Sequence, residues 1–117
     1  MKSRRFRGRA RPVNKLEQAF GEHLLYELTF SSVWFEMLTL RLAPDLRYTP
    51  DWMALNHDGE MSFWEVKGPF KREDSWVKLK MAAEMFPWRF YLVTRPKDEW
   101  VLKEVPKSAA RTVRHRE

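Results

Sequence analysis

The sequence predicts one α+β domain, in which a helix, three strands, a second helix and a further strand form a mixed α/β arrangement. Three observations predict it. Apolar residues near the start repeat at helical spacing, and aromatic and large aliphatic residues dominate segments in the middle of the chain. Later, a helical segment leads into a compact apolar run, and such a strand–helix–strand step is typical of a mixed sheet with helices against it. The 117 residues, 44% of them hydrophobic, suffice for one core but not for two domains.

The first helix is predicted to begin after Asn14, because asparagine is a good capping residue at a helix amino end. Apolar side chains that recur at every fourth position predict one buried face. These side chains are Leu16, Phe20, Leu24 and Leu28. Gly21 has a low helix propensity, so it should weaken the helix slightly without ending it.

Three strands are predicted next, at residues 33–42, 48–55 and 61–67. All three segments are rich in the aromatic and large aliphatic residues that favour strands. Pro44-Asp45 supplies a turn between the first two strands, and Asn56-His57-Asp58-Gly59 supplies a hairpin connection between the second and the third. The middle of the chain is therefore expected to form an antiparallel meander.

A second helix is predicted after this meander, capped by Asp74 or Ser75 and reaching Met85. The compact apolar run at 88–94 is suited to a buried strand, and 100–105 can add a short edge strand. These elements complete the predicted sheet.

Positive charge is concentrated at the two ends of the chain. Residues 1–11 hold six Lys or Arg and no acid, and residues 106–117 hold four against one acid, whereas residues 12–105 hold 12 basic and 15 acidic side chains. We therefore predict a mobile basic arm at 1–13, a domain at 14–105 and a basic tail at 106–117. Basic arms either neutralise a phosphate backbone or only keep a protein dissolved, and we favour the first interpretation.

Several classes of protein are excluded by composition. The chain has no cysteine, so disulfides, thiolate zinc sites and cysteine nucleophiles are absent, and a metal would bind oxygen or histidine ligands, which favours Mg²⁺ or Mn²⁺. No apolar run approaches the roughly 18 residues of a membrane-spanning helix, so we expect no membrane partner. The charged start Met1-Lys2-Ser3-Arg4-Arg5 leads into no apolar signal segment, so a cytoplasmic location is expected.

A candidate catalytic group lies across the predicted hairpin. If the turn centres on Asp58, residues pair when their numbers sum to 116, which places Asp51 opposite Glu65. Lys67 lies two residues beyond Glu65 and therefore projects from the same face of the strand. Two adjacent carboxylates repel each other unless a cation separates them, and the main-chain carbonyl of Val66 could add a third oxygen ligand. The alternative is a simple ion-paired group on a solvated sheet face.

The segment Tyr48-Thr49-Pro50-Asp51-Trp52, followed by Glu65-Val66-Lys67-Gly68, resembles the core motif of the PD-(D/E)XK nucleases. It is especially similar to small phage-type endonucleases, including junction-resolving enzymes, and the resemblance extends from Asn14 to about Thr94. It implies a restriction-endonuclease-like core of order αβββαβ, with Asp51 and Glu65 as metal ligands and Lys67 assisting the nucleophile. Glu17 matches the additional acid of the family's first helix, although a capping box with Asn14 explains it equally well.

The resemblance implies a Mg²⁺- or Mn²⁺-dependent endonuclease that hydrolyses DNA phosphodiester bonds, with branched or structured DNA as substrate and the host cytoplasm as location if a phage encodes it. Two alternatives stay open: a DNA-binding module without activity, and a nuclease subunit that needs a partner in a recombination or packaging complex. Whether the chain forms a homodimer is also open. Basic residues near the motif or in the arm are candidates for phosphate contact, or else ordinary solvated residues. They are Lys71, Arg72, Lys78, Lys80, Arg4, Arg5 and Arg7.

Overall fold

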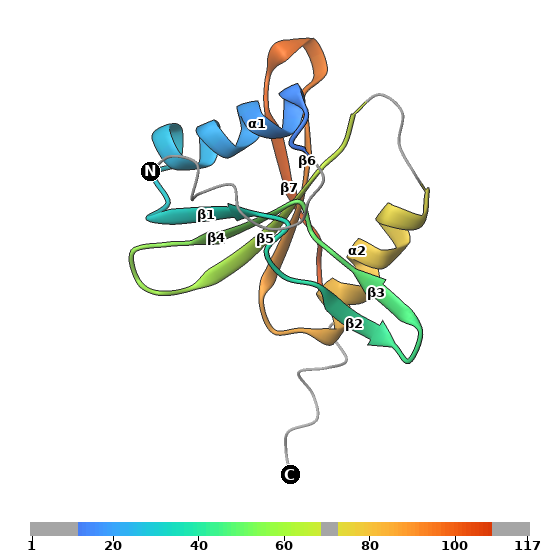
Figure 1. Ribbon diagram of the computed structural model, residues 1–117. Helices are drawn as coiled ribbons and strands as arrows, with labels where there is room; N and C mark the ends of the chain where they lie inside the picture. The colour runs from blue at the N-terminus through green and yellow to red at the C-terminus, as the bar shows by residue number, and fades with distance from the viewer. Residues whose placement is uncertain (1–11, 69–72, 109–117) are drawn as a thin grey trace.

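A mixed sheet of five strands lies at the centre of the computed structural model, between two helices (Figure 1). The structure describes residues 12–68 and 73–108. In chain order the elements are α1 (Lys15–Glu22), the π-helical turn η2 (His23–Glu27), β1 (Ser32–Phe35), β2 (Leu40–Ala43), β3 (Leu46–Tyr48), β4 (Trp52–Leu55), β5 (Met61–Val66), α2 (Glu73–Met85), β6 (Arg89–Thr94), the 3₁₀ turn η3 (Pro96–Asp98) and β7 (Val101–Glu104). The sheet has the strand order β1-β4-β5-β6-β7, and β2 and β3 form a separate two-stranded sheet. The predicted single α+β domain with a mixed sheet is confirmed.

The strand pairing determines where the end of β5 lies. β4 and β5 are antiparallel, with Trp52 opposite Trp64 and Leu55 opposite Met61, so paired residue numbers sum to 116 and the predicted hairpin register is confirmed. β5 and β6 are parallel, and α2 makes the crossover between them. Ligand sites of sheets with parallel strands lie beyond the carboxyl ends of those strands. A ligand site is therefore expected at the end of β5.

The two helices cover opposite faces of the sheet because side chains alternate along each strand. On β5, Trp64 and Val66 pack toward α1, where Phe20 is fully buried. Phe63, the residue before Trp64, packs instead toward α2 with Leu79. The sheet therefore separates two apolar clusters, one under each helix.

The predicted strands at 33–42 and 48–55 are each interrupted, which corrects the sequence interpretation. The first is broken at Glu36, whose φ of 47° lies in the left-handed region. The second is broken between β3 and β4 around Pro50, which has no N–H to give to a sheet. The two breaks meet, since the Glu36 N–H donates to the Asp51 carbonyl at 2.8 Å. The hairpin therefore bends away from the main sheet, and its far half becomes the β2–β3 sheet beside α2 (Figure 1).

Gly21 is required by close packing, which its helix propensity does not reveal. A Cβ at this position would lie 2.5 Å from Cη2 of Trp52 and closer still to Cζ2 of the same ring. Trp52 is fully buried and its indole N–H donates to the Glu17 carbonyl at 3.0 Å, so the ring has little room to move. The helical segment then ends near Leu28, as predicted, after its π-helical last turn. Among the described residues, no helix is long and apolar enough to cross a membrane.

Candidate active site

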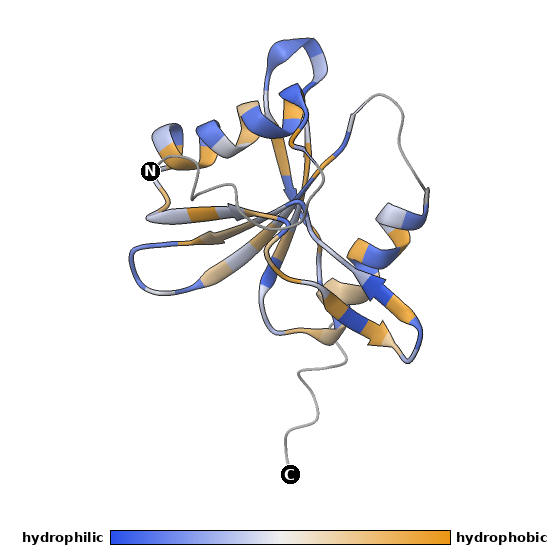
Figure 2. Cartoon of the chain, viewed as in Figure 1, coloured by the Kyte–Doolittle hydropathy of each residue, from blue (hydrophilic) through white to orange (hydrophobic). Residues whose placement is uncertain are grey.

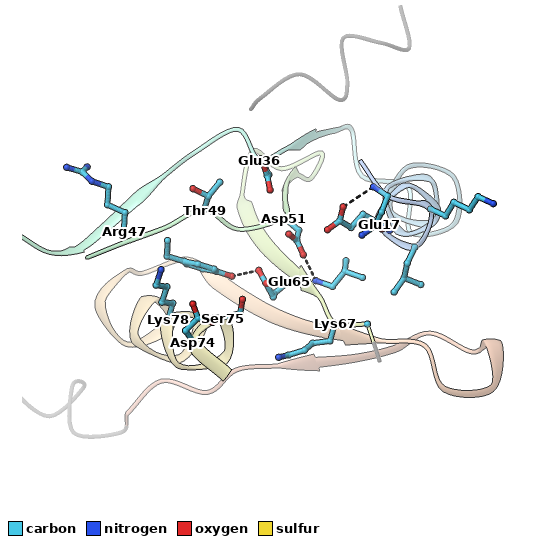
Figure 3. Close-up of a pocket in the computed structure, with 16 residues that line it drawn as sticks. Glu17, Glu36, Arg47, Thr49, Asp51, Glu65, Lys67, Asp74, Ser75 and Lys78 are labelled. Atoms are coloured by element: carbon cyan, nitrogen blue, oxygen red, sulfur yellow. Dashed lines mark hydrogen bonds between the residues drawn. The ribbon is translucent and has the colours of Figure 1, made fainter. Parts of the chain in front are cut away.

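A cavity of about 870 Å³ opens beyond the end of β5, between the amino ends of α1 and α2 (Figure 3). Its lining comes from segments far apart in sequence: the start of α1, the residue that follows β1, the end of β3, the segment before β4, the end of β5 and the first half of α2. A helix amino end carries partial positive charge from its unpaired N–H groups. Two such ends at one cavity favour an anionic ligand there.

Asp51 and Glu65 lie on adjacent strands at this cavity. The β4–β5 register, extended by one residue, places Asp51 beside Glu65, and an Asp51 oxygen accepts the Val66 N–H at 2.8 Å. The N–H and C=O of one strand residue point to the same side, so the Val66 carbonyl also lies on the Asp51 side of β5. Both carboxyl groups are nearly buried, at 7% and 8% exposure. Two carboxylates and one main-chain carbonyl thus come together at the cavity.

Glu65 is held by a tyrosine from the small β2–β3 sheet. The Tyr48 hydroxyl donates to Oε1 of Glu65 at 2.7 Å, and both residues are buried. Burial raises the pKa of Glu65 to about 7, against the Tyr48 hydrogen bond and the positive charge of Lys67, which both lower it, while the charge of Glu17 adds to the rise. Burial, with the charge of Glu65, also raises the pKa of Tyr48 well above its usual value. A bound cation would strongly stabilise the ionised form of a buried carboxyl group with this pKa.

Lys67 follows β5 directly and lines the same cavity. Its main-chain N–H donates to the Val93 carbonyl at 2.8 Å, which extends the parallel pairing with β6 by one residue. The side chain is only 7% exposed, and its charge is felt by Glu65. The structure therefore places a buried lysine in the same cavity, where its charge acts on Glu65.

Glu17 forms the expected capping box and also lies at the cavity. It closes a capping box, since its N–H donates to Asn14 Oδ1 at 2.8 Å and its Oε1 accepts the Asn14 N–H at 3.1 Å. It is also 7% exposed and lines the cavity, with its carboxyl group pointing toward Asp51 in Figure 3. The cap fixes the side chain at the amino end of α1, and this position is the one from which it faces Asp51.

The basic residues suggested for phosphate contact do not share one location. Lys78, on α2, lines the cavity. Lys80 is exposed and lies outside the cavity lining, with its ammonium group 5.0 Å from the Trp76 ring centroid. The others lie outside the described residues, namely Lys71, Arg72, Arg4, Arg5 and Arg7.

Several cavity residues escaped the sequence analysis, among them Glu36, Tyr48 and Arg47. Glu36 lines the cavity from its left-handed position after β1, and in Figure 3 its carboxyl group points toward Asp51. Its signal was a charged residue that follows the apolar run Val33-Trp34-Phe35 inside the predicted strand. Tyr48 belongs to the motif that contains Asp51, but only the bend after β3 brings its hydroxyl to Glu65. Arg47 lies at the far end of the cavity from Glu17 in Figure 3, and nothing in its sequence position indicated this.

The donor set of the cavity fits a hard divalent cation. Among the described residues, no three Asp, Glu, His or Cys side chains form a ready-made metal site. A site of two carboxylates and a main-chain carbonyl does not need three such side chains, and oxygen donors are what Mg²⁺ and Mn²⁺ prefer. The raised pKa of Glu65 is the independent observation, because a cation would relieve the cost of ionising this buried group.

Comparison of the chain with models of protein families, with curated proteins and with solved structures found no match in any of the three.

Proposed function

We propose that this protein is a Mg²⁺- or Mn²⁺-dependent endonuclease of the PD-(D/E)XK type, with the restriction-endonuclease-like core of that family, which hydrolyses phosphodiester bonds of DNA. The observation that carries the proposal is the convergence of Asp51, Glu65 and Lys67 on one cavity. In the sequence these residues form the Pro-Asp and Glu-x-Lys parts of the motif. A solvated ion-paired group is the competing interpretation, and the burial of all three side chains argues against it.

Each residue has a role that its position supports. Asp51, Glu65 and the carbonyl of Val66 would hold the cation, and Tyr48 orients the Glu65 carboxyl group through its hydroxyl. A bound cation would acidify a water molecule and stabilise the charge that develops on the scissile phosphate. Lys67 supplies a positive charge in the same cavity, where it would orient the attacking water and stabilise the transition state.

The surroundings of these residues favour a phosphodiester over a neutral substrate. The amino ends of α1 and α2 both meet the cavity, and helix amino ends attract phosphate oxygens. Lys78 adds a positive side chain from α2. The preference for branched or structured DNA rests on the likeness of the motif to phage junction-resolving enzymes.

The test is cleavage of labelled single-stranded, duplex, flap and four-way-junction DNA in Mg²⁺, Mn²⁺ or EDTA. Wild type is compared with Asp51→Asn, which keeps an oxygen for the Val66 N–H, and with Lys67→Met, which keeps the buried volume. Lys103→Ala, at an exposed position on β7, is the matched control. We expect metal-dependent cleavage that falls by about a hundredfold or more in both site variants and is unchanged in the control.

Three outcomes separate the alternatives. Cleavage by Asp51→Asn at the wild-type rate would refute the assignment of the site. Metal-independent binding without cleavage of any substrate would instead indicate a DNA-binding module. Turnover that appears only when a partner protein is added would indicate a subunit of a larger nucleoprotein complex.

A further inference from the structure

The β2–β3 sheet, hereafter the β2–β3 ribbon, has two chemically different faces. Leu40, Leu42 and Tyr48 are buried in the apolar cluster under α2. Arg41 and Arg47, which alternate with them, are exposed on the other face. Figure 2 shows this alternation of hydrophobic and hydrophilic residues along both strands. The apolar face explains why the ribbon folds against α2, but it does not explain the arginines.

The two arginines are directly opposite each other in the ribbon. Arg41 pairs with Arg47 in the β2–β3 register, just before the register shifts at Ala43. Like charges at directly opposite positions of a sheet are destabilising. Among the described residues, no carboxylate forms an ion pair with either guanidinium group. This arrangement is unfavourable for the isolated chain and becomes favourable when an anion binds both groups.

The ribbon is coupled to the candidate active site. Arg47 lines the cavity, and the next residue, Tyr48, donates its hydroxyl to Glu65 at 2.7 Å. At the base of the ribbon, the hydroxyl groups of Thr39 and Thr49 are hydrogen-bonded at 2.8 Å, which ties its two strands together. In Figure 3 the Arg47 side chain points outward, away from the carboxyl groups and on the same side as Lys78. A polyanionic chain that extends from the cavity on this side would contact Arg47.

We propose that the Arg41–Arg47 face of the β2–β3 ribbon binds backbone phosphates of the nucleic acid strand next to the bond that is cleaved. The proposal rests on the proposed function for the identity of the ligand. Guanidinium groups bind phosphate through two parallel hydrogen bonds, and two of them on one rigid ribbon can hold neighbouring phosphates. The contacts are to the backbone and therefore add affinity and register without base specificity.

The test measures binding in EDTA, so that it is independent of cleavage. Fluorescence anisotropy of a short fluorescein-labelled duplex and of a four-way junction is followed between about 50 and 200 mM salt. Each phosphate contact contributes about 0.9 to the slope of log affinity against log salt concentration on duplex DNA, so loss of two contacts in Arg41→Gln/Arg47→Gln should reduce the slope by about 1.8. We also expect the affinity at low salt to fall by about tenfold or more.

Two controls make this result specific. Arg89→Gln removes one arginine charge at the start of β6, where the side chain is 70% exposed and Arg89 pairs with Ser62, at the end of the sheet away from the cavity. This variant should keep the wild-type slope. Arg41→Lys/Arg47→Lys keeps both charges and should keep most of the slope as well. The thermal midpoint of the glutamine variant should equal or exceed that of wild type, since the change removes a like-charge pair.

An unchanged slope in Arg41→Gln/Arg47→Gln would overturn the proposal, as would an equal loss in Arg89→Gln, or a wild-type protein that binds neither DNA. The arginines would then serve only to keep the exposed ribbon from pairing with other strands. Failure of the proposed function looks different, because it appears as binding with the expected slopes but without cleavage in any metal.

Discussion

Replacing Glu65 with glutamine should change how the stability of the metal-free protein depends on pH. Burial raises the pKa of Glu65 from 4.5 to about 7 in the native state. The native state therefore binds this proton more tightly than the unfolded chain does. The resulting stabilisation is complete below pH 4.5 and is lost as pH rises through about 7. Glutamine does not titrate and still offers an oxygen to the Tyr48 hydroxyl, so the variant lacks this loss.

The expected magnitude follows from the same values. A rise in pKa from 4.5 to about 7, at about 1.4 kcal/mol per pK unit, corresponds to on the order of 3 kcal/mol. The free energy of unfolding of wild type minus that of Glu65→Gln should therefore fall by about this amount between pH 4.5 and about pH 8. Taking the difference cancels groups that titrate equally in both proteins. The measurement is urea unfolding in EDTA across this range, followed by tryptophan fluorescence.

Glu22→Gln is the matched control for the change of side chain, because Glu22 is an exposed glutamate on α1. Adding Mg²⁺ at about pH 8 should then stabilise wild type but not Glu65→Gln, since a ligand that binds only the native state raises its stability. A wild-type-minus-variant difference that stays constant with pH would refute the reasoning on burial. A difference that changes with pH, together with Mg²⁺ stabilisation of both proteins, would leave the burial argument intact and remove Glu65 from the metal site.

Three further predictions concern the supports of the site and of the fold. Tyr48→Phe removes a hydrogen bond that lowers the pKa of Glu65, so the pH midpoint of Mg²⁺-dependent stabilisation should move upward; a midpoint at the wild-type value contradicts this. Gly21→Ala should destabilise the protein by about 1–3 kcal/mol in urea unfolding, because the added Cβ overlaps the buried Trp52 ring. This loss should outweigh the better helix propensity of alanine. A stabilised variant would show that the ring can move. Lys107→Gln should lower the free energy of unfolding by about 1–2 kcal/mol in the same assay. The Lys107 ammonium group donates to three main-chain carbonyls at the carboxyl end of α2 and just beyond it, at 2.6, 2.7 and 2.7 Å. An unchanged unfolding midpoint would contradict this prediction.

The sequence analysis was most successful where structure depends on neighbouring residues. The β4–β5 register follows from a turn of known composition and from alternation along two short strands, so it was predictable to the residue. That register is why Asp51 and Glu65 could be placed side by side before the structure was known. The capping box of Asn14 and Glu17 is local in the same way.

The bends were not predictable, because an apolar run indicates burial but not the surface against which it is buried. The run at 33–42 serves two sheets, and it changes from one to the other at Glu36, where the main chain adopts a left-handed conformation. Pro50 was a visible signal for the matching break, since proline cannot donate to a sheet, but it was outweighed by the strand-forming residues on both sides. These bends bring Tyr48 to Glu65 and place Arg47 at the cavity.

By itself, the sequence determined the α+β class, the succession of helical and strand segments, and the hairpin register that places Asp51 beside Glu65, because each depends on spacing over a few positions. Only the tertiary structure decided that Gly21 makes room for Trp52, that Tyr48 holds Glu65, and that two arginines face outward beside the cavity. These features join residues that are distant in sequence, and the hydrogen bond from Trp52 to Glu17 spans 35 positions. Such contacts depend on how elements pack against one another, and local propensity carries no information about that packing.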